Sequence, residues 1–518
     1  MSCTERSRST VLPQNFPIHP CGSSGRRSPW AITTNSSSKR YSGSGRRRWR
    51  GSRRKASSEG GMTGPAPVLL KNREGEGEMN WFEWIERETR PGEAEKRRGA
   101  FDGLLVLDLS YGNLAGSVCS SFLAEQGARV IRVELPGGDI SRKFTPEGTF
   151  LGDSGLGYLV EELGKESVVL DYLSPEGGAL LKKMASQADV LIETHGQEKM
   201  VSVGLGYPEL SGVNGRLIYL SITPTGNFGP DSAPGEVEAD VVGQARSGII
   251  YLTGEPEEEG KSPEYYQVPT RVGSWFSWYA GGIFGAFSVA GALFYRESSG
   301  KGQFIDLTPS ESILQFLDYN LTWYHAAGRV RERLGNFDIA VYPYTFVRCK
   351  DGYTFIAAYN DDAFRTLCEI MGKVELLDDP RFASFSERTK LENERELVKH
   401  IEEWTSRHTA DEILRIIQDT ISRKSGPGAA VVTGRVNRPD ETLKETHWWE
   451  RGVFVNHEDP DYGRLVLQGP GYKMTETPPR VRREKRPLGA DTVRVLKELC
   501  GLADEELERL KRKGIISS

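Results

Sequence analysis

Cysteine and histidine are scarce in this chain of 518 residues, which has six Cys and seven His. The cysteines are scattered without a C-x-x-C pair, so the usual zinc spacing is excluded. His400 and His408 lie eight residues apart on an expected helix, but no carboxylate pattern accompanies them. We therefore expect no metal site. Dispersed, unpaired cysteines fit a reducing compartment, and we expect a cytoplasmic protein.

An apolar stretch is absent from the first 30 residues, so no secretory signal is visible. Residues 1–60 hold eleven Arg and two Lys against Glu5 and Glu59, a formal charge of +11, which leaves −16 for the remainder. An acidic body argues against nucleic acid as a partner. The Ser-, Arg- and Gly-rich segment cannot bury enough apolar surface to offset its ordering entropy, so we expect residues 1–78 to be a disordered basic extension.

Three interpretations of this extension stay open. It is Arg- and Ser-rich and poor in acids, as transit peptides are. It could also be a basic arm for an anionic surface. We favour an upstream addition from an early start, because Met62 and Met79 offer later starts and the sequence after Met79 is amphipathic.

The dinucleotide fingerprint G-x-G-x-x-G is missing after the first expected strand, where only Gly112 and Gly116 occur in SYGNLAGS. Glu134, at the end of the second strand, is therefore a weak candidate for a ribose-binding acid. Apolar runs still alternate with helix-like segments, one of which begins at Ser174 and Pro175. The strand-like runs are GLLVLDLS, RVIRVE, SVVLDY, DVLIETH and GRLIYLSIT. This alternation predicts crossover units and a parallel sheet.

Charge is absent from the 24 residues between Arg271 and Arg296, which read VGSWFSWYAGGIFGAFSVAGALFY. The run is long enough to span a bilayer, and Gly281 with Gly285 forms a G-x-x-x-G pair. It contains three Ser, several Gly and a single Leu, whereas membrane insertion favours Leu- and Ile-rich segments. We favour a helix buried on all sides in a large soluble domain, and expect no membrane partner.

The charge-free run continues into ESSGKGQFIDL, and together they resemble the centre of the class III CoA-transferases, the formyl-CoA and carnitine CoA-transferase family. There a motif that closes on D-x-x-x-G leads into a long buried helix that ends in R-x-x-x-G-K/R-G-Q-x-I/V-D. Without gaps, Gly282 takes the glycine of the motif, and Arg296 and Asp306 take its tail. The catalytic aspartate of the family then falls on Trp278.

Further motifs follow the order of that family from about residue 101 to 516. They include DLSYGNLAGS with GARVIRVELPGGD, GKESVVLDYLSPEGG, ADVLIETH, VGLGYPEL, ADVVGQARSGIIYLTG and RPLGADTVRVLKELCGL. The resemblance implies an α/β fold with a Rossmann-like parallel-sheet large domain and a smaller α/β domain. The expected bounds are 79–325 for the large domain with its buried helix 278–296, 330–430 for the small domain, and 440–518 for a return to the large domain. It also implies an interlocked dimer, in which two chains thread through each other.

The resemblance implies a carboxylate nucleophile that attacks an acyl-CoA thioester, with anhydride and enzyme-thioester intermediates. Trp278 cannot form an anhydride, so we assign no catalytic residue. Glu264 and Asp306 are the candidate substitutes, but a solvated loop charge and a structural hydrogen bond explain them better. The related racemases need a His where Ala239 precedes Asp240, together with an acid at position 278, and fit worse.

Coenzyme A is implied as a substrate and not as a permanently bound cofactor. The Lys of GKES, Lys165, corresponds to a family lysine that reaches the CoA phosphates. Thr194 and His195 replace an Asn-Phe pair of the adenine pocket, where a His ring can still stack. Ser202 replaces an Arg and weakens the expected phosphate contact. The predicted CoA-binding residues are Leu114, Ala115, Glu134, Lys165, Thr194 and His195.

Acyl-CoA and a carboxylic acid are the substrates implied, with the acyl group unspecified. The favoured interpretation is a subunit without the nucleophile, paired with an active paralogue, as in the non-catalytic subunit of enzymes of the benzylsuccinate CoA-transferase type. The same chain could instead pair with itself. A binding or scaffolding protein for CoA or acyl-CoA is the alternative from a different functional class.

Overall fold

A computed structural model describes residues 69–71, 78–90, 96–152, 154–232, 239–257, 268–423, 430–459, 463–481 and 486–517. The basic segment 1–60 and the loop carboxylate of Glu264 lie outside the described residues. Within the extension predicted to be disordered, β1 (Leu69–Lys71) pairs antiparallel with β2 (Glu78–Asn80).

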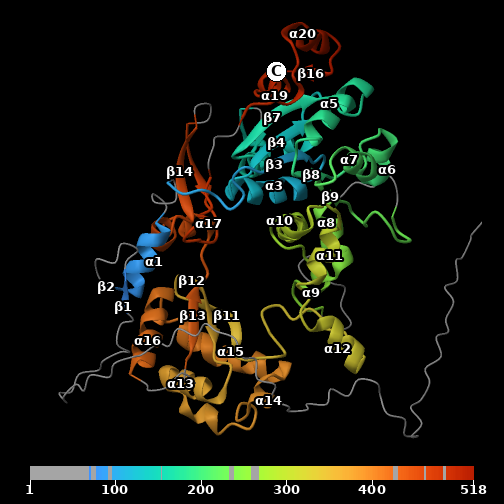
Figure 1. Cartoon of the computed structure of the whole chain (residues 1–518). Coiled ribbons are helices and arrows are strands. Elements are labelled where there is room, and N and C mark those ends of the chain that lie inside the picture. Colours follow the sequence, from blue (N-terminus) through green and yellow to red (C-terminus); the bar gives the residue numbers. More distant parts are fainter. Residues whose placement is uncertain are drawn as a thin grey trace, which may run out of the picture. The chain divides into compact units, whose positions relative to one another are not determined.

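A mainly parallel seven-stranded sheet forms the centre of the large α/β part (Figure 1). Its strand order is β10-β9-β8-β3-β4-β7-β16, and only the short β16 runs antiparallel to its neighbour. Nearly all residues of the inner strands are buried, as expected for a sheet covered on both faces. The strands are β3 (Leu105–Leu109), β4 (Arg129–Glu134), β7 (Lys165–Leu170), β8 (Val190–Glu193), β9 (Ile218–Ile222), β10 (Phe304–Leu307) and β16 (Ile516–Ser517).

Two hydrophobic cores lie on opposite faces of this sheet, because successive side chains of a strand point to opposite faces. On β3, Val106 joins the core under α3 (Ala115–Glu125) and α10 (Phe276–Ser299). Its neighbour Leu107 joins the core under α5 (Pro175–Ala185) and α19 (Thr492–Cys500). The predicted start of α5 is confirmed, since the Ser174 hydroxyl accepts the Gly177 N–H at 3.1 Å.

The predicted burial of α10 on all sides is wrong for the single chain. The face that meets α3 carries glycine: a Cβ on Gly282 would lie 2.5 Å from Val118. On the opposite face Phe287 and Phe294 are 76% and 83% exposed. Apolar composition alone could not say which face has a neighbour. Among the described helices α10 is the one long and apolar enough to cross a membrane, although a core helix passes the same test.

A second unit of structure is a three-stranded antiparallel sheet with its own hydrophobic core. Its strands are β11 (Tyr344–Cys349), β12 (Gly352–Ala357) and β13 (Val432–Arg435), and its helices include α13 (Asp361–Met371), α15 (Leu391–Thr405) and α16 (Ala410–Ser422). A hairpin, β14 (Phe454–Asp459) with β15 (Gly463–Gln468), follows.

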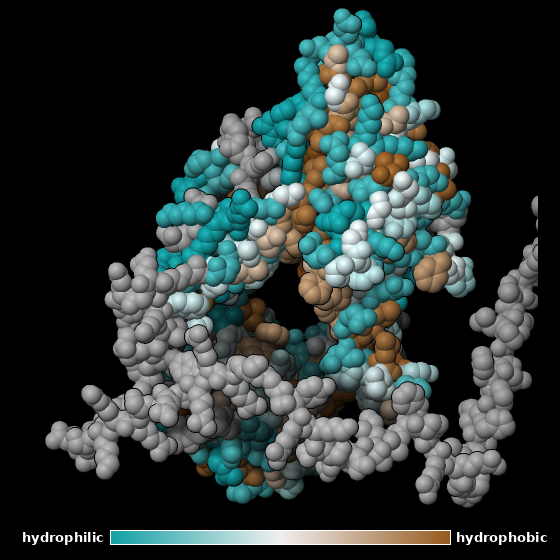
Figure 2. Space-filling view, viewed as in Figure 1, coloured by the Kyte–Doolittle hydropathy of each residue, from teal (hydrophilic) through white to brown (hydrophobic). Residues whose placement is uncertain are grey.

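In the space-filling view, apolar residues reach the surface in the region of α9 and α11 (Figure 2). Shorter helices and strands accompany the parts described above. They are α1 (Trp81–Thr89), β5 (Phe150–Leu151), β6 (Ser154–Gly155), α4 (Leu156–Glu161), α6 (Gln197–Ser202), α7 (Tyr207–Val213), α8 (Asp240–Ser247), α9 (Ile249–Leu252), α11 (Pro309–Leu314), α12 (Asn320–Ala327), α14 (Phe385–Arg388), α17 (Pro439–Thr442), α18 (Thr446–Glu450) and α20 (Asp504–Arg512).

Candidate functional site

A cavity of about 970 Å³ lies where three neighbouring strands end. Residues 111–113 follow β3, residues 194–199 follow β8, and residues 223–227 follow β9, and all three segments line it. Ligands of open parallel sheets bind outside the carboxyl ends of the strands. The topology therefore makes this cavity the candidate binding site.

Two of the predicted CoA-binding residues, Thr194 and His195, form part of the cavity wall. The Thr194 hydroxyl accepts the Tyr111 N–H at 2.8 Å and donates to the Tyr111 carbonyl at 2.9 Å. The His195 and Tyr111 rings are nearly parallel, with centroids 5.6 Å apart. Two flat rings from two loops thus stand side by side at the cavity.

The His195 ring is held neutral. Burial, followed by the charges of Lys199 and Arg132, lowers its pKa to about 4. Its Nε2 forms a 2.8 Å hydrogen bond with the Tyr172 hydroxyl. Glu193 holds the backbone of this segment, because its Oε2 accepts the His195 and Gly196 N–H groups at 2.7 and 2.9 Å. At neutral pH the site therefore presents an uncharged aromatic face.

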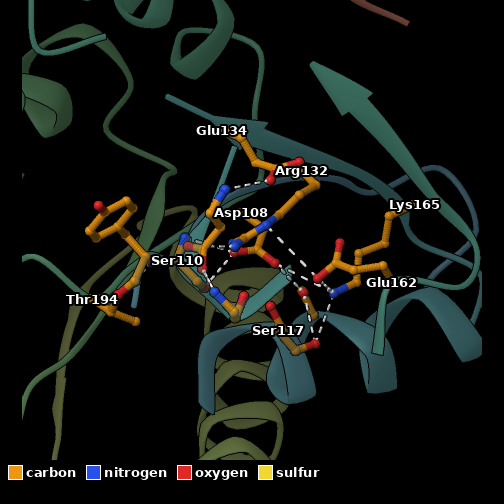
Figure 3. Close-up of polar contacts among 12 residues, drawn as sticks. Asp108, Ser110, Ser117, Arg132, Glu134, Glu162, Lys165 and Thr194 are labelled. Atoms are coloured by element: carbon orange, nitrogen blue, oxygen red, sulfur yellow. Dashed lines mark hydrogen bonds and ion pairs between the residues drawn. The ribbon is translucent and has the colours of Figure 1, made fainter. Parts of the chain in front are cut away.

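Lys165 does not line the cavity, which corrects its predicted place in the site. The buried Nζ donates to the Ser117 carbonyl at 2.9 Å and to Glu162 Oε1 at 3.2 Å, and lies 3.6 Å from Asp108 Oδ2 (Figure 3). These acceptors already surround the ammonium. A contact from this buried lysine to a CoA phosphate would require its side chain to move away from these partners.

The other predicted CoA-binding residues also lie outside the cavity lining. Leu114 and Ala115 are fully buried at the start of α3, within the core against α10. Glu134 is buried and accepts two hydrogen bonds from the Arg142 guanidinium at 2.7 and 2.6 Å, and one from the Asp139 N–H at 3.0 Å. It holds the turn after β4 and faces no open space.

Two cations that sequence reasoning missed, Lys199 and Arg271, line the cavity and are exposed. Ser202, which the resemblance aligns with an arginine of the family, lines it as well. Lys199 lies one helical turn before Ser202 on α6, so it brings positive charge close to that position. A search for basic residues near the altered position would have found it.

Trp278 stands in the first turn of α10 and is 6% exposed at the cavity. Its ring stacks on Phe144, with centroids 5.7 Å apart and planes 12° apart, and it lies 5.9 Å from the Trp275 ring. Phe144 and Trp275 line the cavity too. The three rings make an apolar wall, which we call the aromatic wall.

Asp240 is the carboxylate beside this wall. Its Oδ1 accepts the N–H groups of Ser277 and Trp278 at 2.8 and 3.4 Å, and its Oδ2 accepts the Gln244 amide at 2.7 Å. Burial raises its pKa. The side chain therefore caps the start of α10, a role that sequence could not reveal across such a separation. Asp306 is likewise bound, to Asn227, with 2.7 Å to the amide.

Comparison with known proteins decides the family, since the model of CoA-transferase family III matches residues 101–492. The chain belongs to this family. The alpha subunit of succinyl-CoA–L-malate CoA-transferase from Chloroflexus aurantiacus is 32% identical over 432 residues, which cover 83% of this chain and 89% of that subunit. The beta subunit of that enzyme is 31% identical over 420 residues, covering 80% and 97%. A CAIB/BAIF family protein from Brucella suis has a solved structure with 27% identity and a TM-score of 0.64, covering 78% of this chain and 100% of the other.

Membership in family III identifies the class of reaction. The family transfers CoA between acyl-CoA thioesters and carboxylic acids, so CoA thioesters are its substrates. The expected α/β fold with a mainly parallel sheet is confirmed by the match to the Brucella suis structure. The aromatic wall then stands where the resemblance places the nucleophile of the family.

Proposed function

We propose that this chain is a subunit of a family III CoA-transferase that binds CoA but lacks the nucleophilic carboxylate. The proposal rests on Trp278, which the resemblance assigns to the nucleophile position of the family and whose ring packs into the aromatic wall. An indole cannot accept an acyl group as a carboxylate does. The adjacent Asp240 is occupied by the start of α10.

An active paralogue would supply the missing aspartate. Two relatives are the alpha and beta subunits of one transferase, so paired subunits occur among similar proteins. The exposed apolar face of α10, with Phe287 and Phe294, offers surface for such a partner. Both observations support a hetero-assembly. By the resemblance we propose that it is of the benzylsuccinate CoA-transferase type, and the dispersed cysteines suggest the cytoplasm as its location.

Covalent labelling tests the absence of a nucleophile. The purified chain is incubated with succinyl-CoA and acetyl-CoA, and intact and peptide masses are measured. We expect no CoA-thioester adduct on any carboxylate of this chain, and an adduct on the partner aspartate when the paralogue is co-expressed. An adduct on Asp240, Asp306 or Glu264 in the chain alone would refute the proposal.

CoA binding is tested at His195, because base stacking on an aromatic ring contributes about 1–3 kcal/mol. We expect His195→Ala to raise the CoA dissociation constant roughly tenfold and His195→Phe to keep it near the wild-type value. With a pKa of about 4, the His195 ring should not make the affinity depend on pH between pH 6 and 8. Titration calorimetry measures the affinities and their pH dependence. Equal affinities in all three proteins would show that CoA does not stack on His195.

The alternative is a non-catalytic protein that binds CoA or acyl-CoA without a transferase partner. It is consistent with the same observations, a cavity lined by the rings of Tyr111 and His195 and by the cations of Lys199 and Arg271. CoA binding together with no CoA exchange after co-expression would favour it. A racemase fits less well, because Ala239 and Trp278 stand at both acid–base positions.

A further inference from the structure

A buried network of charged residues joins the loops and strands next to the cavity-lining turns, and the proposed CoA contacts do not involve it (Figure 3). At its centre the Arg132 guanidinium, whose side chain is 1% exposed, donates to Asp108 Oδ1 at 2.8 Å and to Asp139 Oδ2 at 3.2 Å. Paired burial of this kind costs desolvation, and removal of one partner leaves an uncompensated charge. The charged residues of the network are therefore held in place by one another.

Asp139 is the member of this network that is bonded to a residue of the cavity lining. Its Oδ2 also accepts the Gly112 N–H at 3.1 Å, and its Oδ1 accepts the Ser141 N–H at 2.6 Å. Gly112 and Ile140 line the cavity, one in the turn after β3 and the other in the turn after β4. A single buried carboxylate thus joins two cavity-lining turns.

The first of these turns carries the Tyr111 ring of the cavity wall. Thr194 holds its backbone from the β8 side, and Asp139 holds it from the β4 side through Gly112. Gly112 has φ of +79°, a conformation that L side chains rarely adopt, so the direction of its N–H is set by this unusual backbone. Without its acceptor, this N–H has no described partner on the β4 side.

We propose that Asp139 is a positioning residue for the cavity: its carboxylate, held by Arg132, fixes the turns at Gly112 and Ser141 and with them the Tyr111 ring. Its consequence for CoA affinity rests on the proposed function. Its consequence for the turns does not, and the two are measured separately.

Asp189 offers a matched control. Its Oδ2 accepts the Leu105 N–H at 2.9 Å and its Oδ1 accepts the Arg296 guanidinium at 2.9 Å. It is thus also a carboxylate shared between an arginine and a strand-flanking amide. It precedes β8 and contacts the first residue of β3, so it lies at the ends of the strands opposite the cavity.

The experiment compares Asp139→Ala, Asp139→Asn and Asp189→Ala in the full chain as purified. Amide hydrogen exchange by mass spectrometry follows residues 110–114 and 139–143, and calorimetry measures CoA binding. We expect Asp139→Ala to speed exchange in both segments and to raise the CoA dissociation constant roughly tenfold. Asp139→Asn keeps one acceptor oxygen and should give a smaller change in both readouts. Asp189→Ala should lower the melting temperature while leaving both readouts at the wild-type level.

Unchanged exchange at residues 110–114 in folded Asp139→Ala overturns the proposal, as does an equal effect of Asp189→Ala. If Asp139→Ala does not fold, Asp139→Asn decides, and wild-type exchange at residues 110–114 in it overturns the proposal. If the wild-type chain binds no CoA, the proposed CoA site fails, and the exchange data still decide the role of Asp139. Faster exchange with unchanged CoA affinity would show that Asp139 does not position the cavity for CoA.

Discussion

At the scale of single residues, Glu394 combines full burial with the lack of a partner. It is 0% exposed, and neither carboxylate oxygen has a hydrogen-bond partner among the described residues. Burial, together with the charge of Asp338, raises its pKa to about 8. The carboxyl is therefore protonated at neutral pH, since ionisation in such surroundings is strongly disfavoured.

This pKa makes stability depend on pH. The folded state holds the proton more tightly than the unfolded state, so the stabilisation is complete below about pH 4.5 and is lost as the pH rises to about 8. Glu394→Gln should remove that dependence, and its melting temperature should exceed the wild-type value by a margin that grows from pH 5 to pH 8. Glu392→Gln, an exposed neighbour on α15, is the control. If the melting temperatures of Glu394→Gln and wild type change with pH in parallel, the raised pKa of Glu394 is contradicted.

Residue roles divide into those that sequence could predict and those it could not. Thr194 and His195 were predicted from the resemblance to an Asn-Phe pair. They line the cavity because they follow β8 directly, and strand ends gather at one edge of a parallel sheet. Lys165 was misplaced because only tertiary structure shows that Glu162 and Asp108 already surround its ammonium. The capping role of Asp240 was missed because α10 begins more than 30 residues later.

At the scale of elements, α10 and α3 test close helix packing. A Cβ on Gly282 would lie 2.5 Å from Val118 and 2.9 Å from the Ala115 carbonyl, whereas nothing lies within 4 Å at Gly291 of the same helix. Gly282→Ala should destabilise the fold by about 1–3 kcal/mol through overpacking. Gly291→Ala should stabilise it by up to about 1 kcal/mol through helix propensity. Denaturant unfolding measures the free energy of unfolding of both variants. Equal effects of the two substitutions would show that α3 and α10 are not closely packed at Gly282.

Elements were predicted well where the signal was local. The second strand, RVIRVE, is β4 residue for residue, and the helix after Ser174 begins as its cap and Pro175 indicate. The charge-free run correctly predicted a long helix, which extends a few residues beyond 278–296 at both ends. Its two different faces could not be predicted, because an apolar pattern does not distinguish a surface that meets its own chain from one that meets another.

At the scale of the whole molecule, the exposed face of α10 predicts an assembly. Phe287 and Phe294 lie on one helix face and are largely exposed, which is unfavourable for large aromatic side chains in a soluble monomer. Interlocked rings would bury far more than the roughly 1,600 Å² of a standard interface. Such an assembly cannot separate without unfolding, whether the partner is a paralogue or a second copy. Light scattering on serial dilution should therefore show a constant dimer mass.

A charge on this face should prevent the assembly. Phe287→Glu buries an unpaired carboxylate in any interface that covers α10, so we expect monomers or aggregates in place of the dimer. Glu297→Gln changes an exposed position near the end of the same helix and should leave the dimer intact. The decisive observation is the state of the wild-type chain at low concentration. A folded wild-type monomer, with the thermal transition of the concentrated sample, would rule out interlocked rings and leave the aromatic face of α10 to a looser contact.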